Sequence, residues 1–137
     1  MIMLRQIAIS LLLFCLNGTS VADEIRPGYL QLKETGPDIF SVIWKVPAKG
    51  EKKLGLDVEL PANCRDQTRP NTQLVNSAYI QRWIVACEEG LVDKEISISG
   101  LKTTNTDVLL HMEFSDGRSE SAHLIPTRHT YQVPASS

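Results

Sequence analysis

Three histidines are the side chains of this sequence whose type fits metal binding or acid–base chemistry. They are His111, His123 and His129, all in the C-terminal third of the chain. A metal site needs several ligands that converge on one point. His123 and His129 could meet across a bend, which makes them weak metal candidates. The simpler expectation is that all three histidines are surface or lightly packed residues.

The sequence carries none of the short motifs that position a nucleophile, a phosphate or a catalytic zinc. G-x-S-x-G, G-x-x-x-x-G-K and H-E-x-x-H do not occur. A triad assembled from distant residues leaves no such trace, so motifs alone do not decide the question. Because no candidate nucleophile stands beside a base, we expect a protein that is not an enzyme and that needs no cofactor.

Residues 1–22 have the organisation of a secretory signal. Arg5 supplies the positive start, Ile7 to Leu16 forms a short apolar core, and Ser20-Val21-Ala22 places small residues where a signal peptidase cuts. The apolar run is about half of the ~20 residues that a membrane-spanning helix needs, which argues against the alternative of an uncleaved anchor. We expect cleavage near Ala22 and a periplasmic or otherwise extracytoplasmic mature chain.

The expected compartment indicates the chemical state of the cysteines. Cys15 lies in the leader, so Cys64 and Cys87 remain in the mature chain. An even pair in an exported chain favours a disulfide. Metal ligation and a redox pair are the alternatives, but there is no C-x-x-C and no second Cys or His at zinc-finger spacing. We expect a structural disulfide between Cys64 and Cys87.

Composition limits the partner classes. The 137 residues point to one domain, and a hydrophobic content of 42% is ordinary for a globular protein. The net charge is −2 at pH 7, and no segment concentrates Lys and Arg. Nucleic acid and anionic membrane surfaces are therefore not expected as partners.

Apolar and polar residues alternate with a period of two through most of the mature chain, which predicts half-buried strands. Gly, Pro and Asp turn signals separate the expected strands, which are Tyr29–Lys33, Ile39–Val46, Leu54–Leu60, Tyr79–Cys87, Glu95–Ser99, Asp107–Phe114, Ser119–Ile125 and Thr130–Val133. Pro47 should end the second strand. Residues 62–76 are polar and predict a long loop with at most one short edge strand.

This pattern predicts an all-β fold. We expect a single Ig-like antiparallel β-sandwich of about seven to eight strands with one disulfide over residues 23–134, and a C-terminal tail at 135–137. A small closed barrel is the alternative. Trp44 and Trp83 lie on the two strongest strands and are expected to be core anchors, with an exposed tryptophan in a ligand groove as the alternative. Apolar residues on both faces of Tyr79–Cys87 indicate a central strand.

The Asp116-Gly117 dipeptide predicts a tight hairpin. A two-residue turn there would pair Phe114 with Ser119 and Leu110 with His123. His111 and His123 would then lie on opposite faces of the sheet, because successive side chains alternate. This register argues against a metal site that both histidines share.

Short segments along the mature chain have the order and spacing of a known family. They are Glu24–Leu30 (EIRPGYL), Glu34–Asp38, Val42–Pro47, Leu60–Ala62 with Cys64, Arg82–Trp83 with Cys87, Ile96–Leu101 and Thr106–Leu109. On these segments the chain resembles the N-terminal extracytoplasmic domain of HupE/UreJ-like membrane proteins. In that family the domain precedes transmembrane helices that carry the metal-associated histidines, and this sequence stops at Ser137.

The resemblance implies an exported accessory or interaction domain that works beside an integral membrane protein of that family. Nickel transport is not implied for any residue of this chain, because the family's metal-associated histidines belong to the membrane helices. The alternative is a periplasmic protein that binds a metal or a small ligand, although the residues carry no strong small-molecule signal. The oligomeric state does not follow from the sequence.

Overall fold

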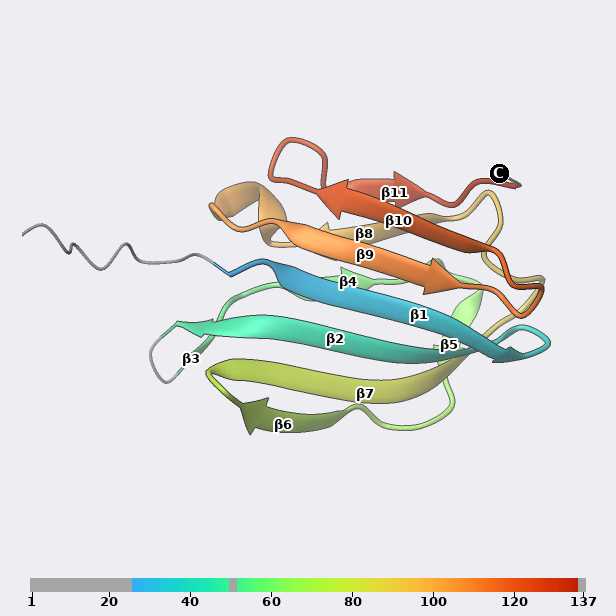
Figure 1. The fold of residues 1–137 in the computed structure, drawn as a ribbon, viewed down its shortest axis with the longest axis horizontal. Helices are drawn as coiled ribbons and strands as arrows, with labels where there is room; N and C mark the ends of the chain where they lie inside the picture. Colours follow the sequence, from blue (N-terminus) through green and yellow to red (C-terminus); the bar gives the residue numbers. More distant parts are fainter. Residues whose placement is uncertain (1–25, 50–51, 136–137) are drawn as a thin grey trace, which may run out of the picture.

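A computed structural model describes residues 26–49 and 52–135, so the expected leader and residues 136–137 of the expected tail lie outside the described residues (Figure 1). These residues form eleven strands and one turn of 3-10 helix. They are β1 (Gly28–Gly36), β2 (Ile39–Lys49), β3 (Lys52–Lys53), β4 (Asp57–Glu59), β5 (Cys64–Asp66), β6 (Asn71–Val75), β7 (Ala78–Cys87), β8 (Glu95–Ser99), η1 (Leu101–Thr103), β9 (Val108–Glu113), β10 (Ser119–Leu124) and β11 (Thr130–Gln132).

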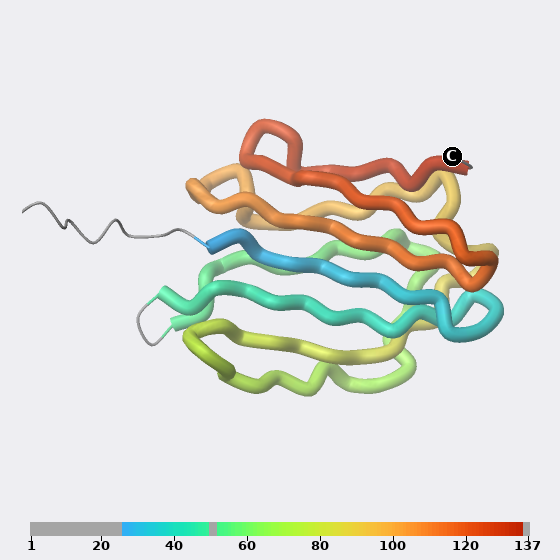
Figure 2. Tube along the Cα trace, in the orientation of Figure 1, coloured from blue at the N-terminus to red at the C-terminus, as the bar shows by residue number. Residues whose placement is uncertain are grey.

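The strands form two sheets that face each other (Figures 1 and 2). The larger sheet has the order β10-β9-β1-β2-β7-β5, with β3 beside β2 and β6 beside β7, and the smaller has the order β11-β8-β4. Neighbouring strands are antiparallel except β1 and β9, which run parallel. The predicted all-β sandwich is confirmed. It has eleven strands rather than seven or eight, several of them only two or three residues long, and one of its strand pairs is parallel.

One face of each long strand lies in a single core between the sheets. The larger sheet contributes alternate apolar residues, and Leu56, Ile96 and Ile98 come from the region of the smaller sheet. The buried hydrophobic residues of the larger sheet are Leu30, Leu32, Phe40, Val42, Trp44, Val46, Ala78, Val85, Cys87, Val108, Leu110, Met112 and Leu124. Their period of two is the pattern that predicted the strands.

The two tryptophans differ in their place in this core. Trp44 is 1% exposed and is a core anchor, as expected. Trp83 packs against the core while staying partly exposed. The reason is its strand: β7 lies toward the β6 side of the larger sheet, whereas the smaller sheet lies behind the part that contains β9 and β1 (Figure 1). β7 lies between β2 and the short strands β5 and β6, so its predicted inner position is confirmed.

Pro47 does not end its strand, so that prediction is wrong. It lies inside β2 and opposes Ala78 of β7. The next amide, Ala48 N–H, donates to Ser77 O with an N–O distance of 2.9 Å, as in a ladder hydrogen bond. The nitrogen of Pro47 therefore points to the other side, where pairing with β1 begins only at Tyr29 and Lys45. A proline is tolerated where its missing N–H has no acceptor to lose.

The stretch expected as a loop at 62–76 contains two strands, β5 and β6. β6 forms a hairpin with β7 around Asn76 and Ser77, whose φ angles of 50° and 63° are those of a type I′ turn. All residues of β6 are exposed, so no apolar alternation marked the strand. The expected strand Leu54–Leu60 shortens to β4, because Leu56 N–H donates back to Leu54 O and turns the chain.

Cys64 and Cys87 form the predicted disulfide, which is confirmed. The two residues oppose each other directly in neighbouring strands β5 and β7. The amide of Asn63 supports the same corner by donating to Glu88 O at 2.7 Å and to Gly90 O at 2.9 Å. The disulfide therefore fastens a short, exposed edge strand to the inner strand β7.

Loss of this disulfide should lower stability markedly. Its cysteines are 23 residues apart, and closing a loop of that length constrains the unfolded chain by about 3.5 kcal/mol. We expect Cys64→Ser/Cys87→Ser to reduce the free energy of unfolding in urea by about that amount. Reductant should destabilise the unmodified protein equally and leave the double variant unchanged. Equal urea midpoints for the oxidised protein and the double variant would contradict this expectation.

Candidate functional site

The β9–β10 hairpin turns through three residues, Ser115–Gly117, rather than two. Phe114 N–H donates to Arg118 O at 2.8 Å, and Gly117 has a φ of 91°. A three-residue loop that ends in a left-handed glycine is the usual alternative to the two-residue turn. Ser115 N–H donates to Glu34 Oε1 at 2.9 Å, so a side chain from β1 helps to hold the loop.

This turn moves the register of the hairpin by one residue from the prediction. Ser119 opposes Glu113 instead of Phe114, and His123 opposes Leu109 instead of Leu110. A slip of one residue exchanges the two faces of a strand. The prediction that His111 and His123 lie on opposite faces is therefore wrong: both point to the outer face of the larger sheet.

The parallel strand β1 completes this outer face. Tyr29 opposes Leu109, and Gln31 opposes His111. Together with β10 they surround a shallow, open hollow of about 590 Å³. Its lining residues are Tyr29, Leu109, Leu110, His111, Ser121, Ala122 and His123. We refer to this place as the outer-face hollow.

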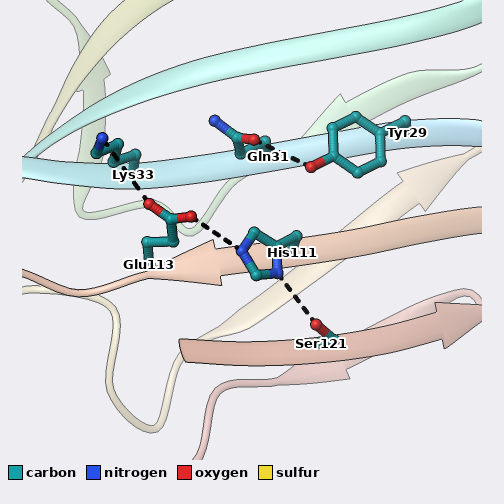
Figure 3. A network of polar contacts seen from close by, with 6 residues as sticks. All are labelled: Tyr29, Gln31, Lys33, His111, Glu113 and Ser121. Carbon is teal, nitrogen blue, oxygen red and sulfur yellow. Dashed lines mark hydrogen bonds and ion pairs between the residues drawn. The ribbon is translucent and has the colours of Figure 1, made fainter. Parts of the chain in front are cut away.

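A polar network crosses three strands beside the hollow (Figure 3). His111 lies between two partners, with Nδ1 at 3.1 Å from Ser121 Oγ and Nε2 at 3.2 Å from Glu113 Oε1. The other carboxylate oxygen of Glu113 lies 3.9 Å from Lys33 Nζ. Both ring nitrogens of His111 are engaged, so the network fixes the ring across β9 and β10. The Lys33–Glu113 pair adds little energy, because both side chains are well exposed.

Three further contacts border the hollow. Tyr29 donates its hydroxyl proton to Gln31 Oε1 at 3.0 Å, which orients the phenol along β1. His123 Nε2 lies 2.9 Å from Asp107 Oδ2, just before β9. The Arg128 guanidinium donates to the His123 carbonyl at 3.3 Å. The two histidines are therefore held by separate carboxylates at different points of the same face.

The order Ser121–His111–Glu113 has the connectivity of a nucleophile, a base and an orienting acid. Such a group also needs donors aimed at a developing oxyanion and a site that excludes water. Ser121 is exposed here, on an extended strand and beside an open hollow. The network of Ser121, His111 and Glu113 therefore lies on the open surface of the sheet.

The two weak metal candidates, His123 and His129, each have other contacts in the structure. His123 is paired with Asp107, and His129 belongs to the segment before β11, where its carbonyl accepts from Ile98 N–H at 3.0 Å. Within residues 26–49 and 52–135, no group of three or more His, Cys, Asp or Glu side chains is arranged to hold a metal ion.

A comparison with protein-family models finds no match, and a comparison with curated proteins finds none either. The resemblance to HupE/UreJ-like proteins therefore stays a prediction. In the described part of the chain, no helix has the length and apolar character that crossing a bilayer requires.

Several residues of this face were not identified from the sequence: Tyr29, Gln31, Glu113 and Ser121. Each is an ordinary polar or aromatic residue at an outward position of a strand. Two facts bring them together, the three-residue turn and the parallel pairing of β1 with β9. Gly117 could have indicated the three-residue turn from the sequence. The pairing of β1 with β9 joins segments far apart in the chain, so no local sequence pattern indicates it.

Engineered cysteine pairs test the register of this hairpin. Leu109 and His123 oppose each other directly, so their Cβ atoms should lie about 4.5–5.5 Å apart. We expect Leu109→Cys/His123→Cys to form an extra disulfide without added oxidant catalyst, detectable by peptide mapping after proteolysis. Leu110→Cys/His123→Cys is the matched control and should stay reduced, because Leu110 points into the core. If only the control pair formed a disulfide, the hairpin would have the predicted two-residue turn and not the three-residue loop.

Proposed function

We propose that this chain is an extracytoplasmic interaction domain that works in the periplasm beside an integral membrane protein of the HupE/UreJ-like kind and has no catalytic activity of its own. The family resemblance supports the kind of partner. The Cys64–Cys87 disulfide supports the compartment, because disulfides persist in oxidising spaces. The partner is a protein, and the contact surface is the outer face of the larger sheet.

The observation that carries this proposal is the character of that face around the hollow. Figure 1 looks onto the face, and no described element lies over it. Leu109 is 42% exposed at its centre, beside the half-buried ring of Tyr29. Polar side chains that can donate or accept hydrogen bonds surround this pair. They are Gln31, His111, Ser121 and His123.

This arrangement favours a protein over a small molecule as the ligand. Protein interfaces combine an aromatic or aliphatic centre with a polar rim, and a few central residues carry most of the binding energy. Small-molecule sites, by contrast, are concave and bury most of the ligand surface. The outer-face hollow is open, so it fits a side chain that protrudes from a partner's loop.

Co-purification from solubilised membranes tests the proposal. The tagged chain should recover an integral membrane protein, and Leu109→Asp should weaken that recovery by about 30-fold or more, the effect of losing one central contact. Val92→Asp is the matched control: Val92 is 37% exposed but lies between β7 and β8, away from the outer face. It should leave recovery unchanged.

Three outcomes would contradict this proposal. The first is that no integral membrane protein is recovered, and the second is that both variants lose binding equally. The third concerns the absence of catalysis: hydrolysis of a simple activated ester by the purified chain, abolished in Ser121→Ala, would make the network of Ser121, His111 and Glu113 a catalytic one.

A second candidate function, binding of a metal or small ligand, rests on one observation. His111 and His123 line the same hollow. Because carboxylates already hold both rings, we expect calorimetric titration with Ni²⁺, Zn²⁺ and Cu²⁺ to give dissociation constants weaker than about 0.1 mM. Tighter binding that is lost in both His111→Ala and His123→Ala, and kept in His129→Ala, would favour the metal-binding function instead.

A further inference from the structure

Strand β6 is a free edge of the larger sheet. It pairs with β7 on one side, and Figures 1 and 2 show it at the margin of the sheet with no described strand beyond it. All five of its residues are exposed. Leu74 is 60% exposed and Val75 is 42% exposed, and with Leu109 they are the three most exposed large aliphatic side chains in the described chain. An exposed edge of this kind is a template for pairing with another strand.

The hairpin geometry defines which backbone groups of β6 are free. In a type I′ hairpin the residues that flank the turn, here Val75 and Ala78, exchange both of their hydrogen bonds. Bonded and non-bonded pairs then alternate along the strands. Gln73 therefore bonds to β7, whereas Thr72 and Leu74 direct their N–H and C=O groups outward, away from the sheet.

The edge also lacks the features that protect natural edge strands. Such strands usually carry a charged residue, a proline or a bulge that prevents pairing. The segment Asn71–Ala78 contains no Asp, Glu, Lys, Arg or Pro. The other margin of the larger sheet is different, because β10 carries the charged residue Glu120 and contacts β11 of the smaller sheet.

We propose that β6 pairs with β6 of a second copy of this chain, antiparallel and related by a two-fold axis through Gln73. In this register Thr72 faces the partner's Leu74, and Leu74 faces the partner's Thr72. These are the residues whose backbone groups point outward, so each pair exchanges two hydrogen bonds and no free group of either residue is left unused. The two larger sheets become one continuous sheet.

A second copy fits this edge for two reasons. The register is self-complementary, as a two-fold interface requires. The strand carries no charge, so its own copy brings no like-charge contact to the pairing. Pairing also places the exposed Leu74 side chain against the partner's Thr72, which removes apolar surface from water. The dimer leaves the outer-face hollow accessible, because β6 and β10 lie at opposite margins of the sheet.

Sedimentation equilibrium of the purified, oxidised chain tests the dimer. We expect a reversible monomer–dimer equilibrium at protein concentrations up to about 1 mM. Thr72→Pro removes an outward N–H that the backbone of β7 does not use, together with the exposed hydroxyl that accepts from Gln81 Nε2 at 3.1 Å. The backbone pairing of β6 with β7 should therefore remain, and the dimer should weaken by at least about tenfold. A chain that stays monomeric throughout, or a dimer that Thr72→Pro does not weaken, would overturn the proposal.

A cysteine substitution tests the register independently of that variant. Gln73 faces its own copy as a non-hydrogen-bonded pair, in which Cα atoms lie about 4.5 Å apart, within the span of a disulfide. We expect Gln73→Cys to form a covalent dimer on oxidation. Leu74→Cys is the control: its two copies would be diagonal neighbours about 7–8 Å apart, too far for a disulfide. Equal cross-linking of both variants, or none of Gln73→Cys, would overturn the two-fold register.

Discussion

Side chains alternate across a strand, and this single constraint couples the core of the protein to its surface. Once the register of a strand pair is set, each inward residue determines the position of its outward neighbour. Leu30, Leu110 and Met112 are buried in the core of the larger sheet. Tyr29 and His111 reach the outer face only because they stand next to these residues in β1 and β9. Burial of the core therefore holds the hollow in place, since any slip would expose apolar residues and bury polar ones.

The same constraint explains which parts of the fold the sequence predicts. Strands with one buried face, such as β2 and β8, show apolar alternation and were identified within a few residues of their bounds. β6 has no buried face, so alternation could not mark it, and only the Asn76-Ser77 turn could have suggested it. The end of β2 was predicted wrongly at Pro47. A proline destabilises a strand only where its nitrogen faces an acceptor on a neighbouring strand, and the sequence alone does not show which way that nitrogen points.

The candidate site was predicted less well than the fold, because the predicted hairpin loop is one residue too short. Asp-Gly favours a two-residue turn, but Gly117 serves equally well as the last residue of a three-residue loop. The contact from Ser115 to Glu34 favours the longer loop, and these residues are 81 positions apart in the chain. Local turn preference was therefore overruled by a contact that only the folded sheet provides. The error of one residue was enough to separate His111 from His123 in the prediction and to hide the hollow.

The two edges of the larger sheet differ in how far the smaller sheet covers them. At one margin β10 contacts β11, so the two sheets approach each other and the sandwich begins to close. At the other margin the smaller sheet stops at β4, and the β6–β7 hairpin extends past it, which leaves Trp83 partly exposed and Leu74 in solvent. The disulfide fastens β5 to β7 near this open margin and limits how far that part of the sheet can fray. Covalent support keeps the open margin ordered enough for the strand pairing that we propose at β6, while no described element covers the outer face near the closed margin.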